Sequence, residues 1–99
     1  SGYRKLTNMV IKSVDELALS GRAFFRSPYD VPAYNHKVIL YEKEADKISL
    51  NLKTAIFDSS LDLSFKIQLR EFADRIDGIA DLAEDVADRL AIYAIKRLT

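Results

Sequence analysis

Carboxylates are the side chains of this sequence with the clearest capacity for chemistry. Residues 74 to 90, DRIDGIADLAEDVADRL, hold six acids spaced three or four residues apart (Asp74, Asp77, Asp81, Glu84, Asp85 and Asp88). Five of the six are aspartates, although aspartate is a poorer helix former than glutamate. Short carboxylates keep their oxygens close to the backbone, and hard cations such as Mg²⁺, Ca²⁺, Mn²⁺ and iron bind such oxygens. The pattern predicts either a cation site or the solvated face of a long helix.

The acidic stripe has few neutralising bases. Within the segment only Arg75 and Arg89 are basic, and both lie one step away from the stripe on a helical wheel. Like charges spaced i,i+4 destabilise an isolated helix by about 0.2–0.5 kcal/mol per pair. A merely solvated face usually mixes both signs of charge. The one-signed stripe therefore favours a counter-ion or a partner, with Asp74 as the member that simply faces solvent.

A second acid pair, Glu42 and Asp46, lies one helical turn apart in YEKEADKI, residues 41 to 48. These two acids stand 15 to 19 residues before position 61, the middle of the turn-forming segment DSSLDLS. Asp77 and Asp81 stand 16 to 20 residues after it. If the flanking helices are antiparallel neighbours, the two pairs reach one level and form one surface site. The predicted metal ligands are these four carboxylates, with three further acids in second rank (Glu84, Asp85 and Asp88).

Two breaker-rich segments divide the chain into three helices. RSPYDVPAY, residues 26 to 34, holds both prolines, and Asp30 within it is a candidate N-cap. DSSLDLS, residues 58 to 64, is rich in turn and cap residues, and Ser60 or Asp62 could start a helix. The predicted helices cover about 3–26, 32–57 and 63–98. Short connections between them predict an all-α, antiparallel up-down-up three-helix bundle with long helices.

The last helix carries the strongest periodic signal. Apolar residues recur in steps of four and three along it (Phe65, Leu69, Phe72, Ile76, Ile79, Ala83, Val86, Leu90 and Tyr93). We expect this heptad seam to hold the bundle together and the acids to lie on the outer face. Beside the seam, alanines recur every seven residues, where another helix could approach closely (Ala73, Ala80, Ala87 and Ala94). A single layer of three helices leaves apolar surface uncovered, particularly along the alanines, which predicts a dimer or a second bundle.

Composition excludes several classes of function. The chain has 99 residues and zero formal net charge, so one domain without nucleic-acid binding is expected. The absence of cysteine excludes thiolate-zinc sites and thiol catalysis. Di-metal bundle enzymes use Glu-x-x-His motifs, whereas the single histidine, His36, lies in none, so no enzyme is expected. The start at Ser1-Gly2, without methionine, suggests an excised part of a larger protein.

Two stretches together resemble a known family. YEKEADKISLNLKTAIF and IDGIADLAEDVADRLAIYAIKR are similar to the PhoU-like regulators of phosphate transport, and most to the shorter branch associated with inorganic-phosphate transporters. The resemblance covers roughly residues 34 to 97. The family pattern of Glu/Asp-x-x-x-Asp on neighbouring helices matches Glu42-x-x-x-Asp46 and Asp77-x-x-x-Asp81. Two departures are that many members have glutamate where this chain has Asp77, and that the chain holds one bundle where the family usually has two.

The resemblance implies a function as well as a fold. It implies half of a six-helix PhoU-like fold, with divalent or iron-type metal ions, iron or zinc among them, on the acidic face. It implies a non-enzymatic regulatory or adaptor domain of phosphate uptake, cytoplasmic and peripheral at the membrane. Its partner would be a phosphate transporter or an associated signalling protein, and it would form a homo-oligomer or pack on a second PhoU-like repeat. The alternative is a metal-free structural or oligomerisation bundle, and a di-metal enzyme is the least favoured interpretation.

Overall fold

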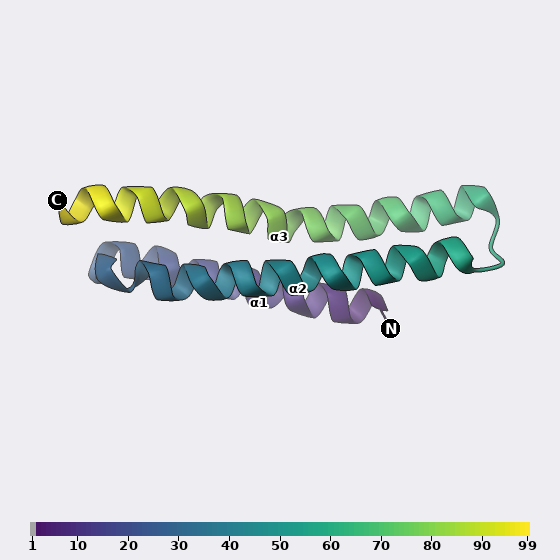
Figure 1. Cartoon of the computed structure of the whole chain (residues 1–99), viewed down its shortest axis with the longest axis horizontal. Coiled ribbons are helices and arrows are strands. Elements are labelled where there is room, and N and C mark those ends of the chain that lie inside the picture. Colours follow the sequence, from purple (N-terminus) through teal and green to yellow (C-terminus); the bar gives the residue numbers. More distant parts are fainter. Residues whose placement is uncertain (1) are drawn as a thin grey trace.

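The computed structural model describes residues 2–99 and shows three long helices packed into a rod of 57 × 18 × 14 Å (Figure 1). Helix α1 spans Gly2–Arg26, α2 spans Val31–Asp58 and α3 spans Leu63–Leu98, with a short 3-10 turn η1 at Pro28–Asp30. The helices run up, down and up along the rod. The predicted all-α three-helix bundle is therefore confirmed, and each helix begins and ends within one residue of its expected bounds.

A proline shapes the first connection and local hydrogen bonds fix the second. Asp30 precedes α2, and proline occupies the first turn of that helix, where its missing N–H removes no helical bond. In the second connection, the Ser59 hydroxyl donates to the Ile56 carbonyl at 2.6 Å. The Lys66 ammonium donates to the Phe57 carbonyl at 2.7 Å, which satisfies one of the free acceptors at the end of α2. These contacts hold α2 and α3 as an antiparallel hairpin.

Small residues from all three helices line the interior of the bundle, with a few larger apolar ones from α1 and α2. The buried side chains of α3 are all alanines (Ala73, Ala80, Ala83, Ala87 and Ala94). The largest fully buried apolar side chains come from α1 and α2, namely Leu6, Val31 and Val38. Small residues facing large ones let side chains interdigitate at high density. The heptad row of alanines therefore sets the close approach of α3 to its neighbours.

A buried polar network crosses the same core. The Ser20 hydroxyl donates to Asn35 Oδ1 at 2.6 Å, and Asn35 Nδ2 donates to the Ala87 carbonyl at 2.7 Å. The Ser13 hydroxyl donates to the Val38 carbonyl at 3.3 Å. Because buried polar groups destabilise a core unless they find partners, this network helps to fix the relative register of the three helices.

The structure corrects the prediction for the face of α3 that meets the core. The alanine row is itself the part of α3 that faces the core. It was expected to lie beside the core and to receive a further helix. Of the predicted seam, Ala83 is buried and Leu69, Ile76 and Leu90 are partly buried, whereas five large members are exposed (Phe65, Phe72, Ile79, Val86 and Tyr93). The reason is packing volume, because buried residues of α1 and α2 are also small, such as Ser13, Ser20 and Ala45, and the helices lie too close for large side chains on α3.

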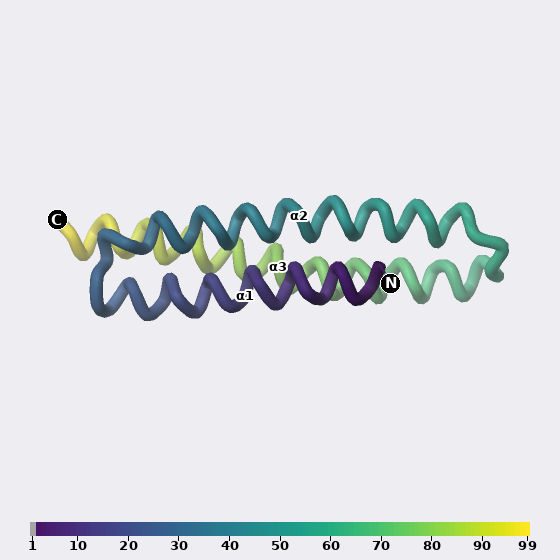
Figure 2. Tube along the Cα trace, turned by 90° about the horizontal axis from the view of Figure 1, so that it is seen from below, coloured from purple at the N-terminus to yellow at the C-terminus, as the bar shows by residue number. Residues whose placement is uncertain are grey.

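The α2–α3 hairpin extends beyond α1 (Figure 2). The first described residue of α1, Gly2, lies against Leu52, six residues before the end of α2. The end of the hairpin forms an open groove of about 500 Å³ lined by apolar and basic residues, including Phe57, Leu63 and Arg70. In the described part of the chain, no helix has a stretch long and apolar enough to cross a membrane.

Candidate metal centre

The antiparallel hairpin brings acids from α2 and α3 to one level. Glu42, Asp46 and Asp81 each offer one carboxylate oxygen, and these three oxygens all lie within 4.8 Å of one another. A cation that takes oxygen ligands at 2.3–2.6 Å, as Ca²⁺ does, can sit between oxygens about 3–5 Å apart. The α2/α3 acidic cluster, as we call Glu42, Asp46, Asp77, Asp81 and Glu84, therefore has a geometry compatible with a bound ion.

Glu42 is the centre of this cluster because it is buried. It shares one face of α2 with Val38, Ala45 and Ser49, which are all buried, and only 5% of its surface is exposed. Burial is the largest cause that raises the pKa of Glu42, and together with the neighbouring carboxylates of Asp81, Glu84 and Asp46 it brings that pKa to about 9. Glu42, predicted as part of a surface site, is therefore a buried member of the cluster.

Asp77 occupies the other end of the cluster. Its pKa is raised to about 7, chiefly by burial and also by the Asp46 and Asp81 carboxylates, while Lys53 opposes the rise. One of its oxygens, Oδ1, is buried and has no hydrogen-bond partner within the described residues. An acceptor that is both buried and unpartnered is unusual in a folded protein and points to a proton or a cation.

The remaining acids divide into two groups. Glu84, predicted in second rank, is half-buried and belongs to the cluster because its carboxylate neighbours Glu42. Asp85 and Asp88 are exposed, and neither is among the groups that act on Glu42 or Asp77. The structure therefore brings Glu84 to the predicted site but not these two aspartates.

Sequence reasoning missed the basic residue beside the cluster. The Lys53 ammonium pairs with the Asp74 carboxylate at 2.6 Å, and it is the base that acts on Asp77. Asp74 is exposed as predicted, yet it has this cross-helix partner. The signal was present, because Lys53 lies seven residues after Asp46 and so projects from the same side of α2.

The donor set decides which cations fit. Five carboxylates meet with one nearby ammonium, so the cluster needs either protons or a cation to balance its charge. All the donors are oxygens, which suit Mg²⁺, Ca²⁺, Mn²⁺ and iron, whereas zinc sites more often include nitrogen or sulfur ligands. The residues therefore fit a hard divalent or iron-type ion, and Glu42, Asp46 and Asp81 offer oxygens close enough together to hold one.

Comparison with known proteins adds one distant relative. The chain is 28% identical over 87 residues to a UPF0111 protein of Thermotoga maritima. The matched stretch is 88% of this chain but 41% of the relative, so the chain spans about two fifths of that protein's length. No protein-family model matches the chain. No solved structure matches it either.

Proposed function

We propose that this chain is a non-enzymatic regulatory or adaptor domain that binds a hard divalent or iron-type cation in the α2/α3 acidic cluster. The observation that carries the proposal is Glu42, which is 5% exposed and faces three other carboxylates. A purely structural core would place an apolar residue or a neutral, hydrogen-bonded one at that position. A cation offers the missing counter-charge and coordinates several carboxylate oxygens at once.

Protons and a cation are competing solutions to the same electrostatic problem. Without metal, Glu42 holds a proton at neutral pH because its pKa lies at about 9, and Asp77 titrates at about 7. A metal ion binds the deprotonated carboxylates and so displaces those protons. Occupancy then depends on both cation concentration and pH, which suits a domain that responds to ionic conditions.

The link to phosphate uptake is also part of this proposal. It is supported by the resemblance of the α2 and α3 motifs to those of PhoU-like proteins, and the similarity to a UPF0111 protein covers both helices. In this role the domain contacts a phosphate transporter or an associated signalling protein at the cytoplasmic membrane surface. Metal in the cluster would adjust the surface that the partner recognises.

Metal content measured on untagged protein tests the cation site. Wild type should carry stoichiometric metal after purification, or take it up from solution. The double variant Asp46→Asn/Asp81→Asn should lose it, and Asp88→Asn, which changes an exposed acid of α3, should keep it. Circular dichroism shows whether each variant keeps the helical fold.

Two results would count against the proposed function in different ways. A metal-free protein whose stability ignores added divalent ions would favour the alternative, a structural or oligomerisation bundle. That alternative has its own support in the exposed apolar residues of α1 and α3. A pull-down from native membranes that recovers no phosphate transporter or signalling protein would refute the regulatory role and leave the metal site intact.

A further inference from the structure

Five of the exposed large apolar residues of α3 form one row along the helix. Phe65, Phe72, Ile79, Val86 and Tyr93 recur every seven residues and are all exposed, with Ile79 at 50% and Phe72 at 55%. A seven-residue repeat keeps side chains on one side of a helix over its whole length. The row contains no charged residue and follows α3 for almost its entire extent.

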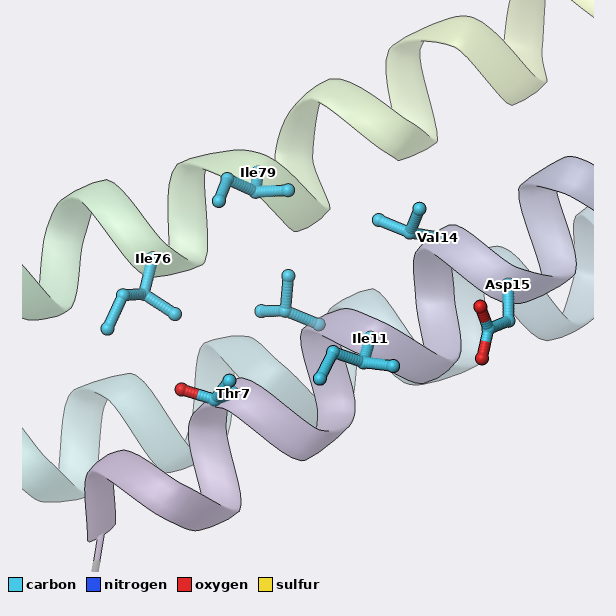
Figure 3. A pocket seen from close by; sticks show the side chains of 7 residues that line it. Thr7, Ile11, Val14, Asp15, Ile76 and Ile79 are labelled. Carbon is cyan, nitrogen blue, oxygen red and sulfur yellow. The ribbon is translucent and has the colours of Figure 1, made fainter.

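Helix α1 continues this apolar surface. Ile11 and Val14 are exposed and, with Ile76 and Ile79 of α3, line an open hollow of about 300 Å³ between the two helices (Figure 3). Nearer the start of α1, the Tyr3 ring packs on the Phe72 ring at 5.5 Å. The five-residue row of α3 and the adjoining Ile11 and Val14 are called the α1/α3 apolar face below.

The size of this face is at the upper end of what a monomer usually exposes. Its seven side chains are about half-exposed. Three are aromatic, with about 150–250 Å² each to bury, and the four aliphatic ones are smaller, so the face is on the order of 600 Å². The largest apolar patch on a typical monomer is about 300–600 Å². A stable interface takes about 800 Å² from each partner. Two such faces packed together bury about 1,200 Å², which is the lower end of the range for a specific interface.

The pattern of the face is complementary to itself. When a second copy is related to the first by a two-fold axis at Ile79, Phe65 faces Tyr93 of the partner subunit. In the same arrangement Phe72 faces Val86 of the partner subunit. Ile11 and Val14 share a hollow with Ile79, so they lie near the same two-fold axis. An interface with two-fold symmetry requires such self-matching. Zero net charge adds no overall repulsion between two copies.

We propose that a second copy of this chain covers the α1/α3 apolar face, forming an antiparallel two-fold dimer centred on Ile79. The interface differs from the sequence-based expectation, because the alanine row is already buried within one bundle. Asp77 and Asp81 flank Ile79 in sequence, and Asp81 projects from the side of α3 roughly opposite to it. The dimer therefore leaves the α2/α3 acidic cluster accessible. A result that disproves the dimer would not argue against the proposed metal site.

Light scattering coupled to gel filtration tests the dimer. The expected mass is twice the 11.2 kDa of one chain. Ile79→Glu should weaken association at least 100-fold, because the two-fold axis brings the two introduced carboxylates together. Ile95→Glu is the matched control, since Ile95 is 65% exposed on the same helix and lies outside the face. A monomeric wild type, or Ile79→Glu that stays dimeric, would overturn the proposal.

Cross-linking gives a second readout that does not depend on a variant that weakens dimer association. The chain contains no cysteine, so single-cysteine variants report one position at a time. Under mild oxidation Ile79→Cys should form a disulfide-linked dimer, whereas Ile95→Cys should react at least tenfold more slowly. Equal rates at the two positions would contradict a two-fold axis at Ile79.

Discussion

The buried carboxylates predict that the metal-free protein loses stability as pH rises. Glu42 has its pKa raised from 4.5 to about 9, so between those values the folded chain holds a proton that the unfolded chain releases. Stability is then fully present below pH 4.5 and falls as pH approaches 9. Asp77 acts in the same direction between pH 3.8 and about 7. This trend is opposite to that of a carboxylate whose pKa is lowered by a salt bridge.

The magnitude follows from the number of protons held. One proton retained only by the folded state changes the free energy of unfolding by about 1.4 kcal/mol per pH unit. Glu42 alone therefore sets an upper bound of about 4 kcal/mol between pH 5 and pH 8. Side-chain rearrangement and water entry reduce such penalties, and we expect a loss of about 2 kcal/mol. For a domain of this size, that lowers Tm by about 10 °C.

Glu42→Gln isolates the cause, because glutamine keeps the shape of the side chain and removes its ionisation. Relative to wild type in EDTA, the variant should be more stable by about 2 kcal/mol at pH 8 and nearly unchanged at pH 5. Urea unfolding between pH 5 and pH 8 measures the difference, with Asp88→Asn as the control that should keep the wild-type slope. Wild-type stability that rises with pH, or a variant with an unchanged slope, would refute the reasoning.

Three further variants test the packing and the charges around the cluster. Ala80→Leu overfills the α3 core line and should destabilise the fold by about 1–3 kcal/mol in urea unfolding; a neutral effect would contradict the assignment of the alanines to the core. Asn35→Ala leaves its two buried hydrogen-bond partners unsatisfied and should lower the free energy of unfolding by about 1–3 kcal/mol, whereas less than 0.5 kcal/mol would show that water replaces the amide. Lys53→Gln breaks the exposed pair with Asp74, so it should change stability by less than about 1 kcal/mol while raising the pKa of Asp77 in an NMR titration; an unchanged pKa would remove Lys53 from the electrostatics of the site.

The fold was predictable because its signals are local. Prolines and turn residues divide the chain, and between them the apolar period leaves no alternative to helices. Counting residues on either side of the turn predicted that the acids of α2 and α3 lie at the same height along the bundle. The structure brings Glu42, Asp46 and Asp81 together there. Both inferences use only helical geometry and chain connectivity, which single sequences contain.

The orientation of α3 was not predictable in the same way. Its apolar seam and its alanine row lie side by side on the helix, and either could face the core by periodicity alone. Which of the two rows faces the core depends on the volume of the opposing side chains, such as Leu6 and Val38. These residues belong to α1 and α2, so the sequence of α3 alone does not contain that information. The burial of Glu42 was not predicted from the sequence for a related reason. A glutamate at the edge of an apolar stripe becomes buried only when the neighbouring helices pack closely over it.

A Mn²⁺ titration that measures binding and proton release together tests the central claim most directly. At pH 7.5, wild type should bind about one ion per chain and release about one proton or more, because Glu42 is protonated in the metal-free state. Glu42→Gln should bind at least tenfold more weakly and release fewer protons. Absence of binding up to millimolar Mn²⁺, or equal binding and proton release in wild type and variant, would contradict a cation site in the α2/α3 acidic cluster.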